Sequence, residues 1–374
     1  MKINKQSIAA ISTPLASIFG SGFLVIIPVL AKATGPWMVL AMACVALFAY
    51  AVGSVIRLNI KYAEPVLAKQ SKPSTTMIEY FSDIAVVMAY VISVTLYLEI
   101  LAAFLLNGLG IDSSRNEAIT VTVVVLIIIV IAITKGLSVL TRLESFALLA
   151  TFILIAAVFS GFAIYDLQSL KDIPIKTPEL SIWESLTIVA GTLIVVQGFE
   201  TPRYLGHEYD AQTRINSSKW SQIISTIIYL IFVALSLPLL HQLNGDYGDS
   251  SLINLVGFTV IPFLGLGVIV AAVLSQFSAA VADTITAEGN VSELTKRKVK
   301  SKVTFMAIGV SSIALAWFAD TFQLIALASK AFALYYFLQC LVAISVVPSL
   351  LKKIMIGLVA LGLFFIVIFA VPAG

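Results

Sequence analysis

The chain has 374 residues, of which 60% are apolar and only 11% charged, with a formal net charge of +3. Soluble domains carry roughly 25% charged residues, so this composition excludes a soluble enzyme, a disulfide scaffold and a nucleic-acid-binding protein. The only two cysteines, Cys44 and Cys340, lie in apolar runs and give no basis for a disulfide framework or a metal cluster. We therefore expect an all-α polytopic membrane protein with no cofactor, no metal and no nucleic-acid partner.

Apolar runs separated by polar breaks predict eleven membrane-spanning helices, since one span requires about 20 apolar residues. The predicted spans cover residues 8–30, 37–57, 77–109, 118–134, 137–165, 184–206, 220–240, 256–288, 303–318, 321–347 and 354–371.

The distribution of the 23 Lys and Arg residues sets the expected orientation. A cytoplasmic N-terminus places most of them in cytoplasmic loops, including the basic run at residues 296–302. The opposite side then receives only Lys32, Arg115, Lys171 and Lys176. We expect the N-terminus to be cytoplasmic and the eleventh helix to leave the C-terminus outside.

The spans also repeat along the chain. A shift that carries Gly20 onto Gly198 brings the first five spans close to the sixth to tenth. Because five is odd, the second copy must enter the membrane from the opposite face, as in the inverted repeats of secondary transporters. The predicted organisation is a first five-helix repeat over 1–166, a second, inverted repeat over 184–347, and an additional helix over 354–371.

The first helix of each repeat carries residues that favour an unwound backbone. Gly20-Ser21-Gly22 interrupts the first span, and residues 197–202, with Gly198 and Pro202, interrupt the sixth. Unwound backbone is tolerated in a bilayer only where it is buried in protein or lines a cavity. Close helix packing is the alternative explanation for each glycine taken singly. Two matched interruptions together predict a central substrate site.

These features resemble the amino acid–polyamine–organocation (APC) superfamily, whose members share the leucine-transporter fold. The resemblance rests on the Gly-Ser-Gly of the first helix and on Gly198-Phe199-Glu200 in the sixth, and it extends from Ile8 to about Val347. It implies a 5+5 inverted repeat with broken helices 1 and 6, in the plasma membrane, which is the inner membrane in bacteria.

The resemblance also implies how a solute would be held. Backbone amides of Ser21, Gly22 and Phe23 would bind a carboxylate, while carbonyls near Ile18 and Phe199 would face an amino group. A zwitterionic amino acid, or a related amine, complements both helix ends and is the leading substrate class.

Ionisable residues within spans are costly and by default functional. Glu200 lies at the break of the sixth helix and is the leading candidate for proton coupling or gating. Glu99 and Lys330 both fall in the outer half of the membrane, where they could form an ion pair or share a proton. A static structural pair is the alternative. In contrast, Asp83, Glu144, Asp283 and Glu288 are expected near cytoplasmic helix ends, where they reach water.

Sodium is the rival coupling ion to the proton. In sodium-dependent members of this fold, carbonyls of the first helix and hydroxyls of the eighth coordinate the ion, and Ser275 and Ser278 have a suitable depth. Their alternative role is a hydrogen bond to a carbonyl one turn earlier. We favour H+ over Na+.

Aromatic side chains could close the site. Tyr90 and Tyr97 share one face of the third helix, with Ser93 between them, and Phe332 lies on the tenth. Ordinary helix packing is the alternative for each of them, but Phe199 is set apart by its place beside the break.

The sequence therefore predicts a secondary active transporter that binds a small polar solute and a coupling ion in a lipid bilayer. A nutrient-sensing receptor subunit of the same fold and an ion or solute channel are the alternatives. Nucleotide-binding loops and catalytic or metal motifs are absent, which argues against ATP-driven pumping and against an enzyme.

Overall fold

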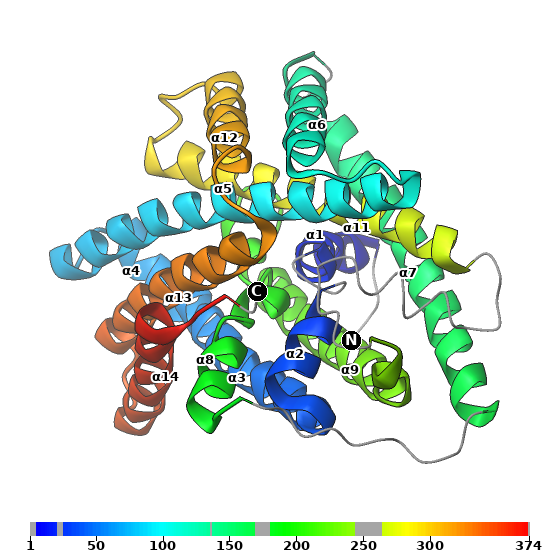
Figure 1. Cartoon of the computed structure of the whole chain (residues 1–374). Coiled ribbons are helices and arrows are strands. Elements are labelled where there is room, and N and C mark those ends of the chain that lie inside the picture. Colours follow the sequence, from blue (N-terminus) through cyan, green and yellow to red (C-terminus); the bar gives the residue numbers. More distant parts are fainter. Residues whose placement is uncertain (1–4, 21–24, 135–136, 169–179, 244–263, 373–374) are drawn as a thin grey trace.

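The computed structural model describes residues 5–20, 25–134, 137–168, 180–243 and 264–372, and all regular structure within them is helical (Figure 1). The first half contains α1 (Lys5–Gly20), α2 (Ile26–Thr34), η1 (Gly35–Trp37), α3 (Met38–Leu58), η2 (Asn59–Ala63), α4 (Glu64–Ala68), α5 (Pro73–Leu109), α6 (Ser114–Thr134) and α7 (Leu137–Gln168). The second half contains α8 (Ile182–Ala190), η3 (Leu193–Val196), η4 (Thr201–Tyr204), α9 (Ala211–Ser236), η5 (Leu237–Leu243), α11 (Leu264–Leu294), α12 (Ser301–Ala316), α13 (Thr321–Val346) and α14 (Leu350–Phe369).

Eight helical segments of the described residues are long and apolar enough to cross a membrane. The three other expected spans are the first and the sixth, which are interrupted, and the ninth, which is the short apolar helix α12 (Ser301–Ala316). Large apolar side chains such as Leu47 and Leu358 are 72% and 64% exposed, as expected of a surface that faces lipid. The prediction of an all-α polytopic membrane protein is confirmed.

Two helices begin earlier than hydropathy predicts because polar residues cap them. The helix α9 starts at Ala211, nine residues before the predicted Trp220, and the Asp210 carboxylate accepts hydrogen bonds from the Thr213 backbone N–H (2.9 Å) and hydroxyl (2.8 Å). These bonds hold the pKa of Asp210 below its ordinary value. Similarly, α14 starts at Leu350 behind the cap residue Ser349. The expected start of the eighth span at 256 lies outside the described residues, and α11 continues to Leu294.

Both predicted interruptions coincide with helix ends. The helix α1 ends at Gly20 and α2 begins at Ile26, while Ser21, Gly22 and Phe23 lie outside the described residues. In the sixth span α8 ends at Ala190, and only the 3-10 turns η3 and η4 follow. Between these turns Gly198 has a φ of +117°, which only glycine adopts without strain. The sixth span is thus interrupted over a longer stretch than predicted.

The helix α5 organises the packing of the bundle. In Figure 1 it crosses the whole molecule, with α13 along one side and α6 and α12 on the other, and it also packs against α11. The helix α1 lies against α11 and α9. The two interrupted spans therefore lie among α5, α9, α11 and α13, and the last helix, α14, covers α13 and contacts α8.

Gly20, at the end of α1, allows the close approach of α1 to α11. A Cβ at this position would lie 1.7 Å from the Ala279 Cβ and 3.3 Å from the Ser275 carbonyl oxygen. Real side-chain carbons do not come this close, so any larger residue forces the two helices apart.

We predict that Gly20→Ala lowers thermal stability, because overpacking a tight contact typically costs about 1–3 kcal/mol. The double variant Gly20→Ala/Ala279→Gly moves the methyl group to the other helix and should recover part of the loss. Gly357→Ala is the control, since a Cβ at that helical position meets nothing within 4 Å. Unfolding midpoints of the purified protein in detergent measure the effect. Equal midpoints for Gly20→Ala and Gly357→Ala would contradict the close contact.

Candidate functional site

Side chains from α9 and α13 satisfy the backbone groups that the interrupted helices leave without helical partners. The Ser329 hydroxyl donates to the Gly191 carbonyl (2.5 Å) and accepts from the Ile194 N–H (3.1 Å). The Tyr229 hydroxyl lies 2.8 Å from the Val195 carbonyl oxygen and 3.0 Å from that of Ile18. Both side chains are fully buried. They therefore provide the internal hydrogen bonds that non-helical backbone requires at membrane depth.

Gly198 brings the two interruptions into direct contact. A Cβ on this glycine would lie 2.7 Å from the Ser17 Oγ and 2.8 Å from the Ile18 backbone nitrogen. The positive φ and the lack of a side chain are thus both required here. The last turn of α1 and the segment between η3 and η4 form one junction, to which we refer as the central junction (residues 17–20 and 197–200).

Glu200 lies at the central junction with its side chain 0% exposed. Its carboxylate accepts hydrogen bonds from the Tyr336 hydroxyl (2.7 Å), the Gly198 N–H (2.9 Å) and the Tyr90 hydroxyl (3.2 Å). No ion pair to Glu200 occurs among the described residues. A buried carboxylate held only by neutral donors can be stable as the anion or take up a proton.

Aromatic rings surround this carboxylate. Phe199 stacks on Tyr336 with ring centroids 5.2 Å apart, and Phe332 contacts Tyr90 edge to face at 5.5 Å. All four rings are fully buried. The structure therefore brings the candidate residues Tyr90, Phe199, Glu200 and Phe332 together.

A second carboxylate, that of Asp283 on α11, also contacts the central junction, at Ser17 and Gln197. Its Oδ1 accepts from the Ser17 hydroxyl (2.6 Å), and its Oδ2 accepts from the Ser93 hydroxyl (2.5 Å). Asp283 is 0% exposed, so the expectation that it reaches water at a helix end is wrong. The helix continues for 11 residues beyond it, because polar residues extend α11 to Leu294.

One signal in the sequence could have identified Asp283. It lies one helical turn after Ala279, the small residue that abuts Gly20, and therefore on the same face of α11. Glu144 on α7 and Glu288 on α11 were likewise expected to reach water, but they are only 0% and 8% exposed.

Gln197 and Tyr97 complete the cluster around Asp283. The Gln197 Nε2 lies 2.5 Å from the Tyr97 hydroxyl, 3.3 Å from the Ser17 hydroxyl and 3.4 Å from the Asp283 Oδ2. Gln197 and Glu200 belong to the same non-helical segment. This short stretch therefore contacts both carboxylates of the central junction.

The remaining predicted residues lie elsewhere or have other contacts. The Ser275 hydroxyl donates to the Ala272 carbonyl (3.2 Å), and the Ser278 hydroxyl donates to the Glu144 carbonyl (3.0 Å). Glu99 is buried and Lys330 is half-buried, but none of the ion pairs in the described part of the chain joins them. Within those same residues no three His, Cys, Asp or Glu side chains form a metal site.

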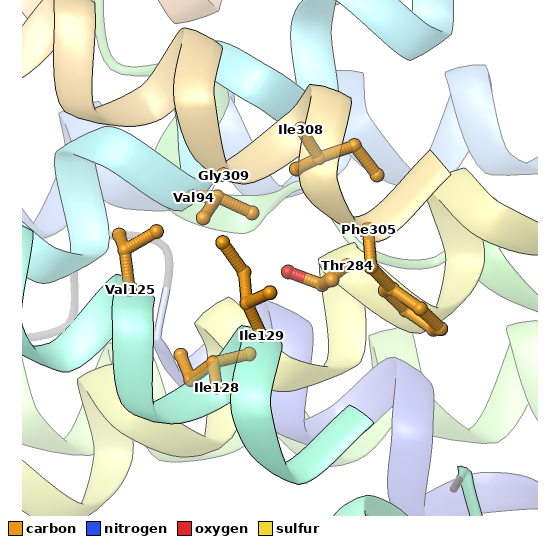
Figure 2. A pocket seen from close by; sticks show the side chains of 8 residues that line it. All are labelled: Val94, Val125, Ile128, Ile129, Thr284, Phe305, Ile308 and Gly309. Carbon is orange, nitrogen blue, oxygen red and sulfur yellow. The ribbon is translucent and has the colours of Figure 1, made fainter. Parts of the chain in front are cut away.

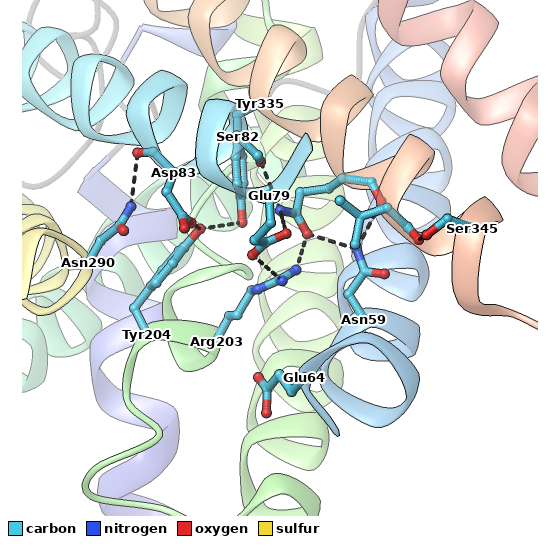
Figure 3. Close-up of polar contacts among 12 residues, drawn as sticks. Asn59, Glu64, Glu79, Ser82, Asp83, Arg203, Tyr204, Asn290, Tyr335 and Ser345 are labelled. Atoms are coloured by element: carbon cyan, nitrogen blue, oxygen red, sulfur yellow. Dashed lines mark hydrogen bonds and ion pairs between the residues drawn. The ribbon is translucent and has the colours of Figure 1, made fainter. Parts of the chain in front are cut away.

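A second polar network, which the sequence analysis missed, lies directly after the break (Figure 3). The Arg203 guanidinium pairs with the Glu79 carboxylate of α5 at 2.5 Å and also donates to the Gln339 side chain of α13. Gln339 in turn donates to Ser82 (2.8 Å) and accepts from Asn59 of η2 (2.7 Å). Arg203 directly follows the predicted interruption at residues 197–202, and this basic residue within a span was the available signal.

Further contacts extend this network toward α9. Arg214 makes a bidentate ion pair with Glu64 of α4, with both distances 2.7 Å, and it donates to the Arg203 carbonyl (2.9 Å). Tyr204 lies 3.1 Å from the Tyr335 hydroxyl and 3.4 Å from the Asp83 carboxylate. The turn η4 is thus tied by polar contacts to α5, α9 and α13.

The pocket shown in Figure 2 is separate from these polar clusters. It lies between α5, α6, α11 and α12 and is lined by Val94, Val125, Ile128, Ile129, Thr284, Phe305, Ile308 and Gly309. Its one polar side chain, Thr284, already donates to the Ala280 carbonyl (2.6 Å). This pocket offers only apolar contact.

The chain is similar to known proteins along nearly its whole length. A family profile described as APC superfamily transporter matches residues 2–370. An uncharacterized protein of Aquifex aeolicus (strain VF5) is 35% identical over 336 residues, which are 88% of this chain and 82% of that protein.

Two solved structures share the fold. A substrate-bound, outward-open Na+-coupled sialic acid symporter has a TM-score of 0.62 at 15% identity, covering 97% of this chain and 88% of that one. A manganese transporter of Eremococcus coleocola also has a TM-score of 0.62, at 12% identity, covering 96% and 85%. At these identities the likeness shows the fold and carries no information on the substrate.

We predict that Tyr229→Phe destabilises the protein by about 1–3 kcal/mol, because it removes a buried hydroxyl that lies within hydrogen-bond distance of the Ile18 and Val195 carbonyls. Tyr80→Phe is the matched control, since Tyr80 is 52% exposed. Thermal unfolding in detergent measures both. A Tyr229→Phe variant as stable as Tyr80→Phe would show that the interrupted backbone does not depend on this hydroxyl.

Proposed function

The chain belongs to the APC superfamily of transporters, and on this premise we propose that it is a secondary active transporter that moves a small polar solute by alternating access, coupled to H+. It is an integral membrane transport protein rather than an enzyme. The solute we propose is an amino acid or a related amine, and the membrane is the plasma membrane, which is the inner membrane in bacteria.

The environment of Glu200 is the observation that carries this proposal. The carboxylate is fully buried at the central junction and accepts from two tyrosine hydroxyls and one backbone N–H. A buried charge without an ionic partner is costly to move through a low-dielectric interior, whereas the protonated group is neutral. Protonation of Glu200 would therefore lower the cost of changing conformation, which is what coupling requires.

The surroundings of the junction support a small solute with an apolar part. Tyr90, Phe199, Phe332 and Tyr336 supply aromatic walls, and stacking against such rings suits a small organic molecule. The amides of Ser21, Gly22 and Phe23 as carboxylate donors, and the Ile18 carbonyl as an acceptor, remain part of this proposal. The Ile18 carbonyl accepts a hydrogen bond from the Tyr229 hydroxyl, and a bound amino group would replace this donor.

The network around Arg203 supports alternating access. All side chains of the central junction are buried. On one side of the junction, Arg203 joins η4 to α5 through Glu79 and to α13 through Gln339. In the orientation expected from the charge bias of the loops, this side is cytoplasmic. We propose that the network closes the cytoplasmic path, and that the repeats 1–166 and 184–347 move against each other when it opens, with 354–371 as an additional helix.

The hydroxyls of α11 favour H+ over Na+ at the site expected from the family. The hydroxyls of Ser275 and Ser278 both donate to backbone carbonyls. For Ser275 the acceptor is the carbonyl one helical turn earlier, which is the role expected in place of ion coordination. Glu99 and Lys330 remain proposed coupling or gating residues of the outer half.

We predict that Glu200→Gln abolishes uptake driven by a proton gradient but keeps exchange of labelled for unlabelled solute. The amide keeps the shape of the carboxyl group but cannot carry a proton. The measurement is uptake of labelled amino acids and amines into liposomes containing the purified protein. Glu184→Gln is the control, because Glu184 is exposed in a capping box that also accepts Gln.

If the Glu200→Gln variant accumulates solute in liposomes with the same pH dependence as the unchanged protein, Glu200 does not carry the coupling proton. Solute binding without flux by the unchanged protein would instead indicate a receptor, and flux that never exceeds equilibration would indicate a channel.

A further inference from the structure

A basic side chain without a counter-ion, that of Arg57, lies between α3 and α9. Its guanidinium donates to the Gln222 Oε1 (2.6 Å) and the Ser218 hydroxyl (3.4 Å), both on α9. Within α3 it donates to the Ser54 hydroxyl (2.8 Å) and the Tyr50 carbonyl (3.4 Å). All four acceptors are neutral, and no Asp or Glu pairs with Arg57 among the residues that the structure describes. The positive charge of this half-buried group is therefore not compensated by them.

The contact between α3 and α9 fixes the direction of this guanidinium. The Gln222 Nε2 donates to the Ala49 carbonyl (2.8 Å), which leaves the Gln222 Oε1 to accept from Arg57. Gly53 allows this approach, since a Cβ at that position would lie 2.2 Å from the Gln222 Oε1. The guanidinium carbon also lies 4.8 Å from the centre of the Tyr50 ring. Arg57 is thus held in one place at the interface of the two helices.

Two more positive charges accompany Arg57. Lys61 follows it by four residues in η2, which packs against α9, and Lys219 directly follows the Ser218 that Arg57 contacts. Both lysines are exposed, and neither forms an ion pair within the described part of the chain. Glu64, three residues after Lys61, is already paired with Arg214. The surface around Arg57 is therefore positively charged.

This surface lies where the hydrocarbon of the bilayer is expected to end. Arg57 is the last residue of the second span predicted from hydropathy, and Trp220 is the first residue of the seventh. The bond from Arg57 to Ser218 places these two boundaries side by side. Trp220 is 39% exposed, and tryptophan is enriched at the level of the lipid headgroups. Further into the membrane the same two helices expose Leu47 and Ile227, which suit contact with acyl chains.

We propose that the Arg57 end of the α3–α9 interface is a binding site for an anionic phospholipid, whose phosphate accepts hydrogen bonds from Arg57. A guanidinium suits this group because its planar N–H donors match two phosphate oxygens. Lys61 and Lys219 favour a headgroup with a net negative charge over a zwitterionic one. In the orientation expected from the charge bias of the loops, the lipid belongs to the cytoplasmic leaflet. This inference does not depend on what the protein transports.

The test is thermal unfolding of the purified protein in detergent micelles that contain a rising mole fraction of dioleoyl phosphatidylglycerol. Dioleoyl phosphatidylcholine, which has the same chains and a phosphate but no net charge, is the lipid control. We expect the unfolding midpoint to rise and saturate at a lower mole fraction of phosphatidylglycerol, because a ligand that binds the folded state stabilises it. Arg57→Gln should raise the mole fraction that gives half of this rise at least about fivefold, since one positive charge near anionic lipid is lost.

A second variant covers the case in which Arg57→Gln does not fold, because that substitution also removes bonds to α9. The double variant Lys61→Gln/Lys219→Gln leaves those bonds in place and should raise the same mole fraction at least about tenfold. Lys352→Gln/Lys353→Gln is the matched control, since it removes two positive charges from the first turn of α14, and it should keep the response of the unchanged protein.

Four outcomes would overturn the proposal. The first is an equal response to the two lipids. The second is an unchanged phosphatidylglycerol response in Lys61→Gln/Lys219→Gln or in a folded Arg57→Gln variant. The third is an equal shift in Lys352→Gln/Lys353→Gln, which would show attraction to any basic loop. The fourth is the same rise in midpoint with soluble glycerol phosphate, which would identify a free phosphate ion in place of a lipid.

Discussion

The structure depends on one constraint, which is that a backbone that leaves the helical conformation inside a membrane must find its hydrogen bonds within the protein. The interrupted sixth span meets it through Ser329, which serves the Gly191 carbonyl and the Ile194 N–H, and through Tyr229, which lies between the carbonyls of Val195 and Ile18. These side chains fix where α9 and α13 lie relative to the break. Because the Tyr229 hydroxyl contacts both interrupted spans, the same constraint also holds them together.

The contact at Gly198 then determines where the chemistry can be. Gly198 lies against Ser17 and Ile18 without room for a Cβ. On either side of it in the sequence, the Gln197 side chain contacts α1, α5 and α11, and the Glu200 carboxylate contacts α5 and α13. Glu200 is held by tyrosines and a backbone amide, and Asp283 by hydroxyls and the Gln197 amide. Two carboxyl groups without ionic partners in the described part of the chain are unusual at such burial. Both contact the same short segment, Asp283 through the Gln197 amide and Glu200 through the Gly198 N–H.

The sequence predicted the helical fold, the two interruptions and the place of Glu200, because hydropathy and the paired glycines are local signals. It also placed Tyr90, Ser93 and Tyr97 on one face of the third helix, where they contact the two carboxylates. It missed Asp283, because hydropathy ended the eighth span at 288 whereas the helix continues to Leu294 and moves that residue into the interior. It missed the Arg203–Glu79–Gln339 network, since its members come from three distant parts of the chain and no spacing pattern connects them. Ser275 and Ser278 were chosen by depth, but hydroxyl direction depends on neighbouring carbonyls that a sequence does not reveal.

The central claim is that the central junction is the place that opens alternately to the two sides of the membrane. It is tested most directly by labelling Ser93→Cys, in a chain whose Cys44 and Cys340 are replaced by alanine, with a membrane-impermeant maleimide in liposomes. Ser93 is fully buried beside Asp283, and cysteine keeps its size. The account predicts labelling from only one face at a time, with the reactive face changing when solute or the proton gradient is changed. Labelling from both faces under one condition, or from neither face under any condition, would contradict it.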